Sequence, residues 1–207
     1  MTRAMLAAAL VGLAACGEPT IPERRPAYPF DWFGLVFRWP VERLPVRYFA
    51  DPRGAMPRLL GGAIAQWEQQ FLYGEFEGVL VPDSVTADVV VLWRDTVPPD
   101  VPSDPGTPVD ACNGVTTFAI DSVDTIAGPL TVTLWPSPGF TDGQVAACLE
   151  RVSVHELGHS LGLLQHSLVS TDVMAAPPLV GAPSAGDRVT AEVLYHTRPS
   201  IGPPPRP

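Results

Sequence analysis

The chain has 207 residues, which is enough for one domain of ordinary size with flanking segments. Hydrophobic residues make up 46% and charged residues 17%, so the chain can bury a core and does not have the composition of a disordered protein. The net charge is −9 and the sequence contains no basic run, which excludes nucleic acid as an expected partner. We expect a monomer.

Residues 1–15 have the pattern of a secretory signal peptide. Arg3 supplies a positive charge, and the apolar stretch that follows is too short to span a bilayer as a mature helix. It ends in LAAC at Cys16, which resembles the lipobox of bacterial lipoproteins, in which the cysteine is lipidated. The alternative is an ordinary signal peptide with a chance cysteine. Both interpretations predict an exported protein, and lipidation of Cys16 predicts a membrane-anchored protein of the cell envelope, on its periplasmic or extracellular face.

The rest of the chain divides into three parts by composition. Residues 16–38 are irregular and punctuated by proline, and we interpret them as a tether. Residues 39–197 contain the periodic apolar patterns of a folded domain. Residues 198–207 are rich in proline, and we expect a mobile tail there.

Five strands and three helices are predicted within the domain. The strands cover residues 44–49, 76–81, 87–93, 115–120 and 130–135, and the third is so apolar that we expect it at the centre of a sheet. A first helix over 57–72 carries an apolar stripe, a long helix over 142–164 starts with Asp142 as N-cap, and a short helix follows a capping box at 184–187.

Two histidines on the long helix indicate a metal site. His155 and His159 are four residues apart, which places both imidazoles on one helix face within reach of one ion. Glu156 lies beside the first histidine, where it can act on metal-bound water as a catalytic base. Gly162 allows the chain to leave the helix sharply, so that His166 can return as a third ligand.

The segment HELGHSLGLLQH, followed by Met174 in the tripeptide DVM, resembles the metzincin clan of zinc peptidases and, within it, the matrixin-like peptidases. The resemblance implies an α+β fold with a twisted mixed sheet, a sheet-packing first helix, a long active-site helix and a short last helix. It implies one catalytic Zn²⁺ held by His155, His159 and His166, with Glu156 as catalytic base. It also implies Gly162 as the turn glycine and Met174 as the Met-turn residue.

The spacing of the third histidine departs from the family pattern. His166 is eleven residues after His155, and Gln165 occupies the standard tenth position. Some bacterial matrixin-like sequences have a similar longer form that ends in His-Ser. The added residue falls after Gly162, where it rotates neither helical ligand, and imidazole is the commoner metal ligand, so we prefer His166.

Cys112 and Cys148 are the two remaining cysteines. In an exported protein such a pair is typical of one disulfide, and two free thiols are the alternative. By the resemblance, the bond would fasten a strand beside the substrate cleft to the active-site helix. Matrixins hold structural Ca²⁺ in acidic loops at this place, but the four aspartates of the Pro-rich segment match no calcium loop, so we prefer a solvated loop there: Asp95, Asp100, Asp104 and Asp110.

The function expected from these observations is hydrolysis of peptide bonds in extracytoplasmic proteins or peptides, by Glu-assisted attack of zinc-bound water. Ala175 to Leu179, which follow the Met-turn, are expected to line a specificity pocket. The alternative from another class is a non-catalytic, zinc-stabilised surface lipoprotein that acts as a binding module. His196 and Tyr195 are expected to be a surface residue and a packing residue.

Overall fold

The computed structural model describes residues 24–99 and 110–206. In this part of the chain, two short 3-10 helices, Val41–Arg43 and Ser84–Thr86, accompany the main elements. The main elements follow the predicted order, and each end lies within four residues of its predicted position. They are β1 (Val46–Ala50), α1 (Met56–Glu68), β2 (Gly78–Leu80), β3 (Val89–Trp93), β4 (Cys112–Thr117), β5 (Leu130–Pro136), α2 (Asp142–Leu161) and α3 (Ala185–His196).

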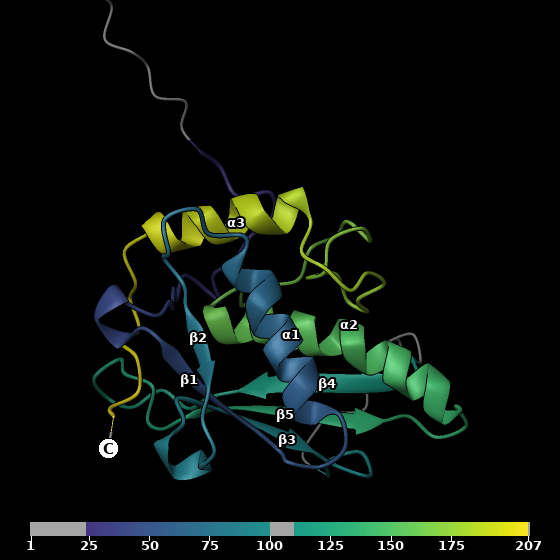
Figure 1. The fold of residues 1–207 in the computed structure, drawn as a ribbon. Helices are drawn as coiled ribbons and strands as arrows, with labels where there is room; N and C mark the ends of the chain where they lie inside the picture. The colour runs from purple at the N-terminus through teal and green to yellow at the C-terminus, as the bar shows by residue number, and fades with distance from the viewer. Residues whose placement is uncertain (1–23, 100–109, 207) are drawn as a thin grey trace, which may run out of the picture.

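The five strands form one mixed sheet in the order β2-β1-β3-β5-β4 (Figure 1). β1 pairs in parallel with β2 and β3, and β3 pairs in parallel with β5. β4 is antiparallel to β5 and forms one edge. The apolar segment around Val89 and Val91 therefore lies at the centre of the sheet, as predicted. The fold is α+β, as expected.

Two helices pack against different strands of the sheet. α1 contacts β1 and β2, whereas α2 contacts β4 and β5. Residues at helical spacing bury the inner face of α1, and among them Trp67 is fully buried. Its indole Nε1 donates a hydrogen bond of 2.8 Å to Val154 O on α2. This bond fixes α2 against α1 one residue before His155.

The starts and ends of the helices have identifiable caps. The N-cap of α2 is Thr141, not Asp142 as predicted. The Thr141 hydroxyl accepts a hydrogen bond from Gln144 N, and the side-chain oxygen of Gln144 accepts one from Thr141 N. Asp142 is instead the first helical residue, where its charge favours the helix dipole. The predicted capping box of α3 is confirmed, with Ser184 as N-cap and Asp187 at the third position.

The segments on both sides of the predicted domain pack against it. In 24–38, Tyr28, Phe30 and Phe37 are buried, which corrects the interpretation of this part as a tether. In 198–206, Ile201 is buried and pairs with Phe37 in a short bridge, which corrects the expectation of a mobile tail. The signal peptide and the tether as far as residue 23 lie outside the described residues.

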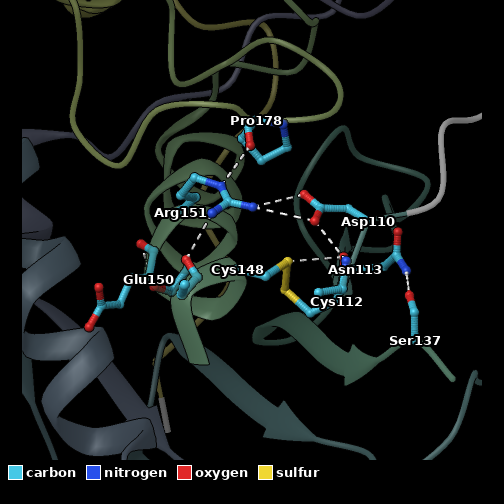
Figure 2. The surroundings of a disulfide bond; sticks show 11 residues. Asp110, Cys112, Asn113, Ser137, Cys148, Glu150, Arg151 and Pro178 are labelled. Atoms are coloured by element: carbon cyan, nitrogen blue, oxygen red, sulfur yellow. Dashed lines mark hydrogen bonds and ion pairs between the residues drawn. A yellow bond between two sulfur atoms is a disulfide. The ribbon is translucent and has the colours of Figure 1, made fainter. Parts of the chain in front are cut away.

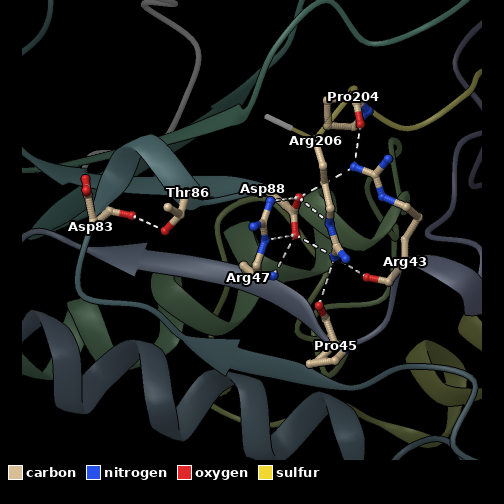
Figure 3. Close-up of polar contacts among 8 residues, drawn as sticks. All are labelled: Arg43, Pro45, Arg47, Asp83, Thr86, Asp88, Pro204 and Arg206. Carbon is tan, nitrogen blue, oxygen red and sulfur yellow. Dashed lines mark hydrogen bonds and ion pairs between the residues drawn. The ribbon is translucent and has the colours of Figure 1, made fainter.

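The last described residue, Arg206, reaches a buried carboxylate next to the start of β3 (Figure 3). Its guanidinium lies 2.9 Å from Asp88, which also binds Arg47 at 3.1 Å and Arg43 at 3.6 Å. Asp88 precedes β3 and is 2% exposed. Burial by itself raises the pKa of Asp88, but the hydrogen bonds from Arg47 and Arg206 outweigh it and lower the pKa overall.

No helix among the described residues combines the length and the apolar character that crossing a bilayer requires.

Candidate metal centre

Three imidazoles converge at the C-terminal end of α2. His155 and His159 lie on one face of the helix, and their Nε2 atoms are 3.1 Å apart. His166 comes from the segment after the helix, and its Nε2 lies 3.2 Å from that of His159. One ring nitrogen from each of the three residues lies within 4.8 Å of the others, so the cluster could hold a metal ion.

Backbone carbonyls determine which ring nitrogens carry protons. His155 Nδ1 lies 2.8 Å from Val173 O, and His159 Nδ1 lies 2.6 Å from Leu163 O. A carbonyl only accepts hydrogen bonds, so both Nδ1 atoms are the protonated donors and both Nε2 atoms carry lone pairs. Two lone pairs that face each other at 3.1 Å repel, and a cation between them removes the repulsion. The donor set therefore fits a metal ion.

The same environment keeps the three imidazoles neutral. Burial lowers the pKa of His155 to about 4. The pKa of His159 is lowered well below its ordinary value, first by burial and then by the neighbouring His155 and His166. Burial also lowers the pKa of His166. At neutral pH the cluster consists of uncharged imidazoles, which is the form that binds metals.

Gly162 turns the chain so that His166 can reach the cluster. It caps α2 in the left-handed conformation with φ 109°. A Cβ on Gly162 would lie 1.9 Å from Phe37 O, so space as well as backbone conformation requires glycine here. The structure brings His166 into the cluster.

Met174 packs beneath the helical histidines. Its side chain is fully buried, and a Cβ on Gly158 would lie 2.3 Å from its sulfur, so the methionine rests directly against the helix between the two ligands. Asp187 of α3 accepts hydrogen bonds from Val173 N at 2.8 Å and Met174 N at 3.3 Å. α3 thus holds the turn whose carbonyl orients His155.

Glu156 is a buried carboxylate beside the cluster. It is 4% exposed, and burial raises its pKa to about 7, against the opposing hydrogen bond from Thr116. Thr116 Oγ1 on β4 donates to Glu156 Oε2 at 2.7 Å. On the same strand, a Cβ on Gly114 would lie 2.5 to 2.8 Å from three side-chain atoms of Glu156. β4 therefore makes room for the carboxylate and orients it.

The cluster and Glu156 open into a cavity of about 950 Å³. Its walls are β4 on one side and the segment after Met174 on the other, where Ala176, Pro177 and Pro178 line it, as expected from the sequence. β4 is an edge strand, so its outer side has no partner strand among the described residues. The cavity is thus bounded by a strand whose backbone groups are available to a ligand.

A disulfide and an ion pair tie the walls of this cavity to α2 (Figure 2). Cys112 at the start of β4 is bonded to Cys148 on α2. One turn further along the helix, Arg151 lies 3.0 Å from Asp110 and donates to Pro178 O at 3.1 Å. A single guanidinium therefore connects both walls.

The other residues considered as sites lie elsewhere. Asp95 contacts Arg53 and the Trp93 indole, whereas Asp110 pairs with Arg151, so these two aspartates do not form one group. Asp100, Asp104 and the lipidation residue Cys16 lie outside the described residues. Tyr195 is buried against Phe71, with ring centres 4.7 Å apart, and His196 is exposed, both as predicted.

Sequence reasoning missed the residues that support Glu156 and His155. Gly114 had a recognisable signal, because a glycine at the edge of a strand pattern often marks a close approach by another group. Thr116 had no recognisable signal, because it lies 40 residues from Glu156 in the chain. Asp187 had no signal for its second role either, because a capping residue does not show by its sequence that it also binds a distant turn. Trp32, from a segment interpreted as a tether, lines the cavity.

Comparison with protein-family models gave no match for this chain, and comparison with curated proteins gave none either. The arguments for function therefore depend on the geometry of the site.

Proposed function

We propose that this chain is a zinc-dependent endopeptidase of the metzincin kind, matrixin-like, that hydrolyses peptide bonds of extracytoplasmic proteins or peptides. The observation that carries the proposal is the convergence of three neutral imidazole nitrogens beside a buried carboxylate, in a cavity with an open edge strand. Each part has a use in peptide hydrolysis, and a purely structural metal site has no use for Glu156.

The donor set favours zinc among the common metal ions. Zinc binds imidazole nitrogen well, and catalytic zinc sites use three protein ligands with one position open. His155, His159 and His166 supply those three ligands. When bound, the ion supplies Lewis acidity, which lowers the pKa of water and polarises a carbonyl group.

Glu156 has the properties of a general base that later acts as an acid. A pKa of about 7 lets it accept and release a proton near neutral pH. Thr116 occupies Oε2, which leaves Oε1 to take a proton from the attacking water and to deliver it to the leaving amine. This carboxylate is held by β4, so it stays oriented during both transfers.

The open edge of β4 suits an extended peptide. A peptide that pairs with an exposed edge strand gains main-chain hydrogen bonds and presents alternate side chains to pockets. β4 places such a peptide beside Glu156, and the Ala176–Pro178 wall faces it across the cavity. This geometry favours cleavage within a chain rather than recognition of a terminus.

We also propose export and anchoring at the cell envelope through a lipidated Cys16. The proposal depends on the signal-peptide and lipobox patterns alone. Mass analysis of the mature N-terminus tests it, since unprocessed Met1 or unmodified Cys16 would contradict it.

The decisive experiment compares the purified, zinc-loaded chain with its Glu156→Gln variant on a broad peptide library. We expect wild type to bind one zinc ion and to cleave peptides internally. The variant should bind zinc equally and lose activity by about 100-fold or more. Zinc binding without any cleavage by wild type, or equal cleavage by the variant, would refute the endopeptidase and favour the zinc-stabilised binding module.

A further inference from the structure

The cavity runs along β4, and its two ends differ. The disulfide ties Cys112 at the start of β4 to Cys148 on α2, and further along the same two elements Thr116 contacts Glu156. β4 and α2 therefore lie side by side and run in the same direction. One end of the cavity lies at the disulfide, and the other lies beyond Thr117, where Phe118 and Ile120 line it.

The N-terminal segment closes this second end. Phe30 O accepts a hydrogen bond of 2.9 Å from Leu164 N, which places residues 30–35 beside the chain that leads to His166. Trp32 lines the cavity there together with three other apolar side chains, Phe118, Ile120 and Leu164. An apolar end wall thus lies next to the third ligand.

The backbone of Trp32 is fixed by hydrogen bonds, whereas its side chain is partly exposed. Paired backbone hydrogen bonds of 3.0 and 2.9 Å join Trp32 to Leu35, and Asp31 accepts from Gly34 N at 2.7 Å. Phe33, at the tip of this turn, has the unusual φ of 51°. The Trp32 side chain is 46% exposed, so core packing does not account for it. A rigid, half-open indole is typical of a binding contact.

The charges of the cavity indicate what the indole contacts. Among the described residues that line it, the carboxylates are Glu156 and Asp110. Asp110 belongs to the disulfide end and is paired with Arg151 at 3.0 Å (Figure 2). Near Trp32, none of the described residues that line the cavity carries a charge, so they offer an apolar surface and no partner for a charged side chain.

We infer that Trp32 is a specificity-determining residue, whose indole forms the wall of a subsite for a large apolar side chain of the peptide. The inference rests on the proposed function of the same cavity. It assigns to the N-terminal segment a direct contact with substrate, because the segment brings Trp32 to the end of the cavity beside His166.

The test uses the full chain loaded with zinc and a peptide series in which each position is varied between alanine, leucine, phenylalanine, lysine and glutamate. Cleavage is measured as kcat and KM for wild type, Trp32→Ala and Trp32→Phe. Tyr73→Ala is the control, because Tyr73 is an aromatic residue that is 83% exposed and does not line the cavity, whereas the ring of Phe33 contacts Trp32 itself. Peptide binding is measured separately in the Glu156→Gln background.

We expect wild type to prefer leucine or phenylalanine over alanine at one position by about tenfold in kcat/KM, with most of the difference in KM. Trp32→Ala should lose that preference, whereas Trp32→Phe and Tyr73→Ala should keep it. An unchanged preference in Trp32→Ala, or an equal loss in Tyr73→Ala, would overturn the inference. Binding that depends on Trp32 without any cleavage would refute the endopeptidase and leave the subsite standing.

Discussion

Thr116 and Glu156 are joined by a hydrogen bond of 2.7 Å that links the edge strand of the sheet to the helix carrying the histidines. The hydroxyl donates to one carboxylate oxygen, and its donation also stabilises the ionised form, since the bond lowers the Glu156 pKa against the effect of burial. The strand that would receive the peptide is therefore also the strand that orients the base. Substrate binding and proton transfer share one structural support.

Removing this hydroxyl should reduce turnover without removing the metal. For Thr116→Val we expect kcat to fall about tenfold, less than the 10²–10⁴ contributed by a general base itself, because Glu156 remains but loses its orientation. Thr116→Ser keeps the donor and serves as the control. Steady-state kinetics together with zinc stoichiometry check the prediction, and equal kcat values for the valine and serine variants would contradict it.

Gly114 should be intolerant of a methyl group for a local reason. In Gly114→Ala the added Cβ would lie 2.5 Å from Glu156 Cγ, so the carboxylate must move. We expect kcat to fall about 100-fold with zinc binding retained. Gly128→Ala is the control, because nothing lies within 4 Å of its Cβ position. A Gly114→Ala variant as active as Gly128→Ala would contradict the prediction.

The identity of the third ligand can be tested at two adjacent residues. His166→Ala should weaken zinc binding by at least about 100-fold, since loss of even an outer-shell partner can cost that much. Gln165→Ala should leave the affinity unchanged, because Gln165, unlike His166, does not line the cavity into which the cluster opens. Competition with a chelating dye gives both dissociation constants. The reverse pattern would assign the site to Gln165.

A side chain at Gly162 would meet both an unfavourable backbone conformation and a close contact with Phe37 O, and two variants can separate these two costs. Gly162→Ala would place a Cβ at φ 109° and 1.9 Å from Phe37 O, so we expect a loss of about 3 kcal/mol or more in the free energy of unfolding. Gly139 also has a positive φ of 89° but open space around it, so Gly139→Ala should cost only about 1 kcal/mol. Urea titration measures both values, and equal losses would mean that the Phe37 contact is unimportant.

Asp88 should make the free energy of unfolding depend on pH in the acidic range. Its pKa in the folded protein lies below the ordinary value of 3.8, so its contribution is complete above about pH 4 and is lost as the pH falls through the folded pKa. We expect Asp88→Asn to cost about 2 kcal/mol at pH 7, because a 2% exposed partner of three arginines loses its charge. The difference between wild type and variant should shrink below pH 4.

The predictable part of the site is the part encoded locally. His155, Glu156 and His159 occupy one helix, so their spacing alone determines that they lie together, and Gly162 ends that helix with its own φ preference. The capping box of α3 is equally local. Periodicity also predicted the five strands and their order in the chain, with β4 displaced by three residues from the predicted 115–120.

What the sequence could not predict depends on contacts between distant segments. Proline-rich composition excludes regular structure, but it does not exclude packing, because proline carbonyls still accept hydrogen bonds. Pro45 O receives one from Arg206, and Pro178 O receives one from Arg151. The burial of Phe37 under Ile201 likewise has no local signature. Both flanking segments were therefore misinterpreted for the same physical reason.

The pairing of Phe37 with Ile201 has a consequence for when the metal centre can form. A chain that leaves a ribosome or a translocation channel N-terminus first exposes Phe37 long before its partner. Phe37 is also the residue whose carbonyl closes over Gly162, at the turn that directs His166 toward the other two imidazoles. The segment that closes over Gly162 is thus paired with a residue that emerges after all three histidines. The order of synthesis itself therefore delays assembly of the cleft until Ile201 is available to pair with Phe37.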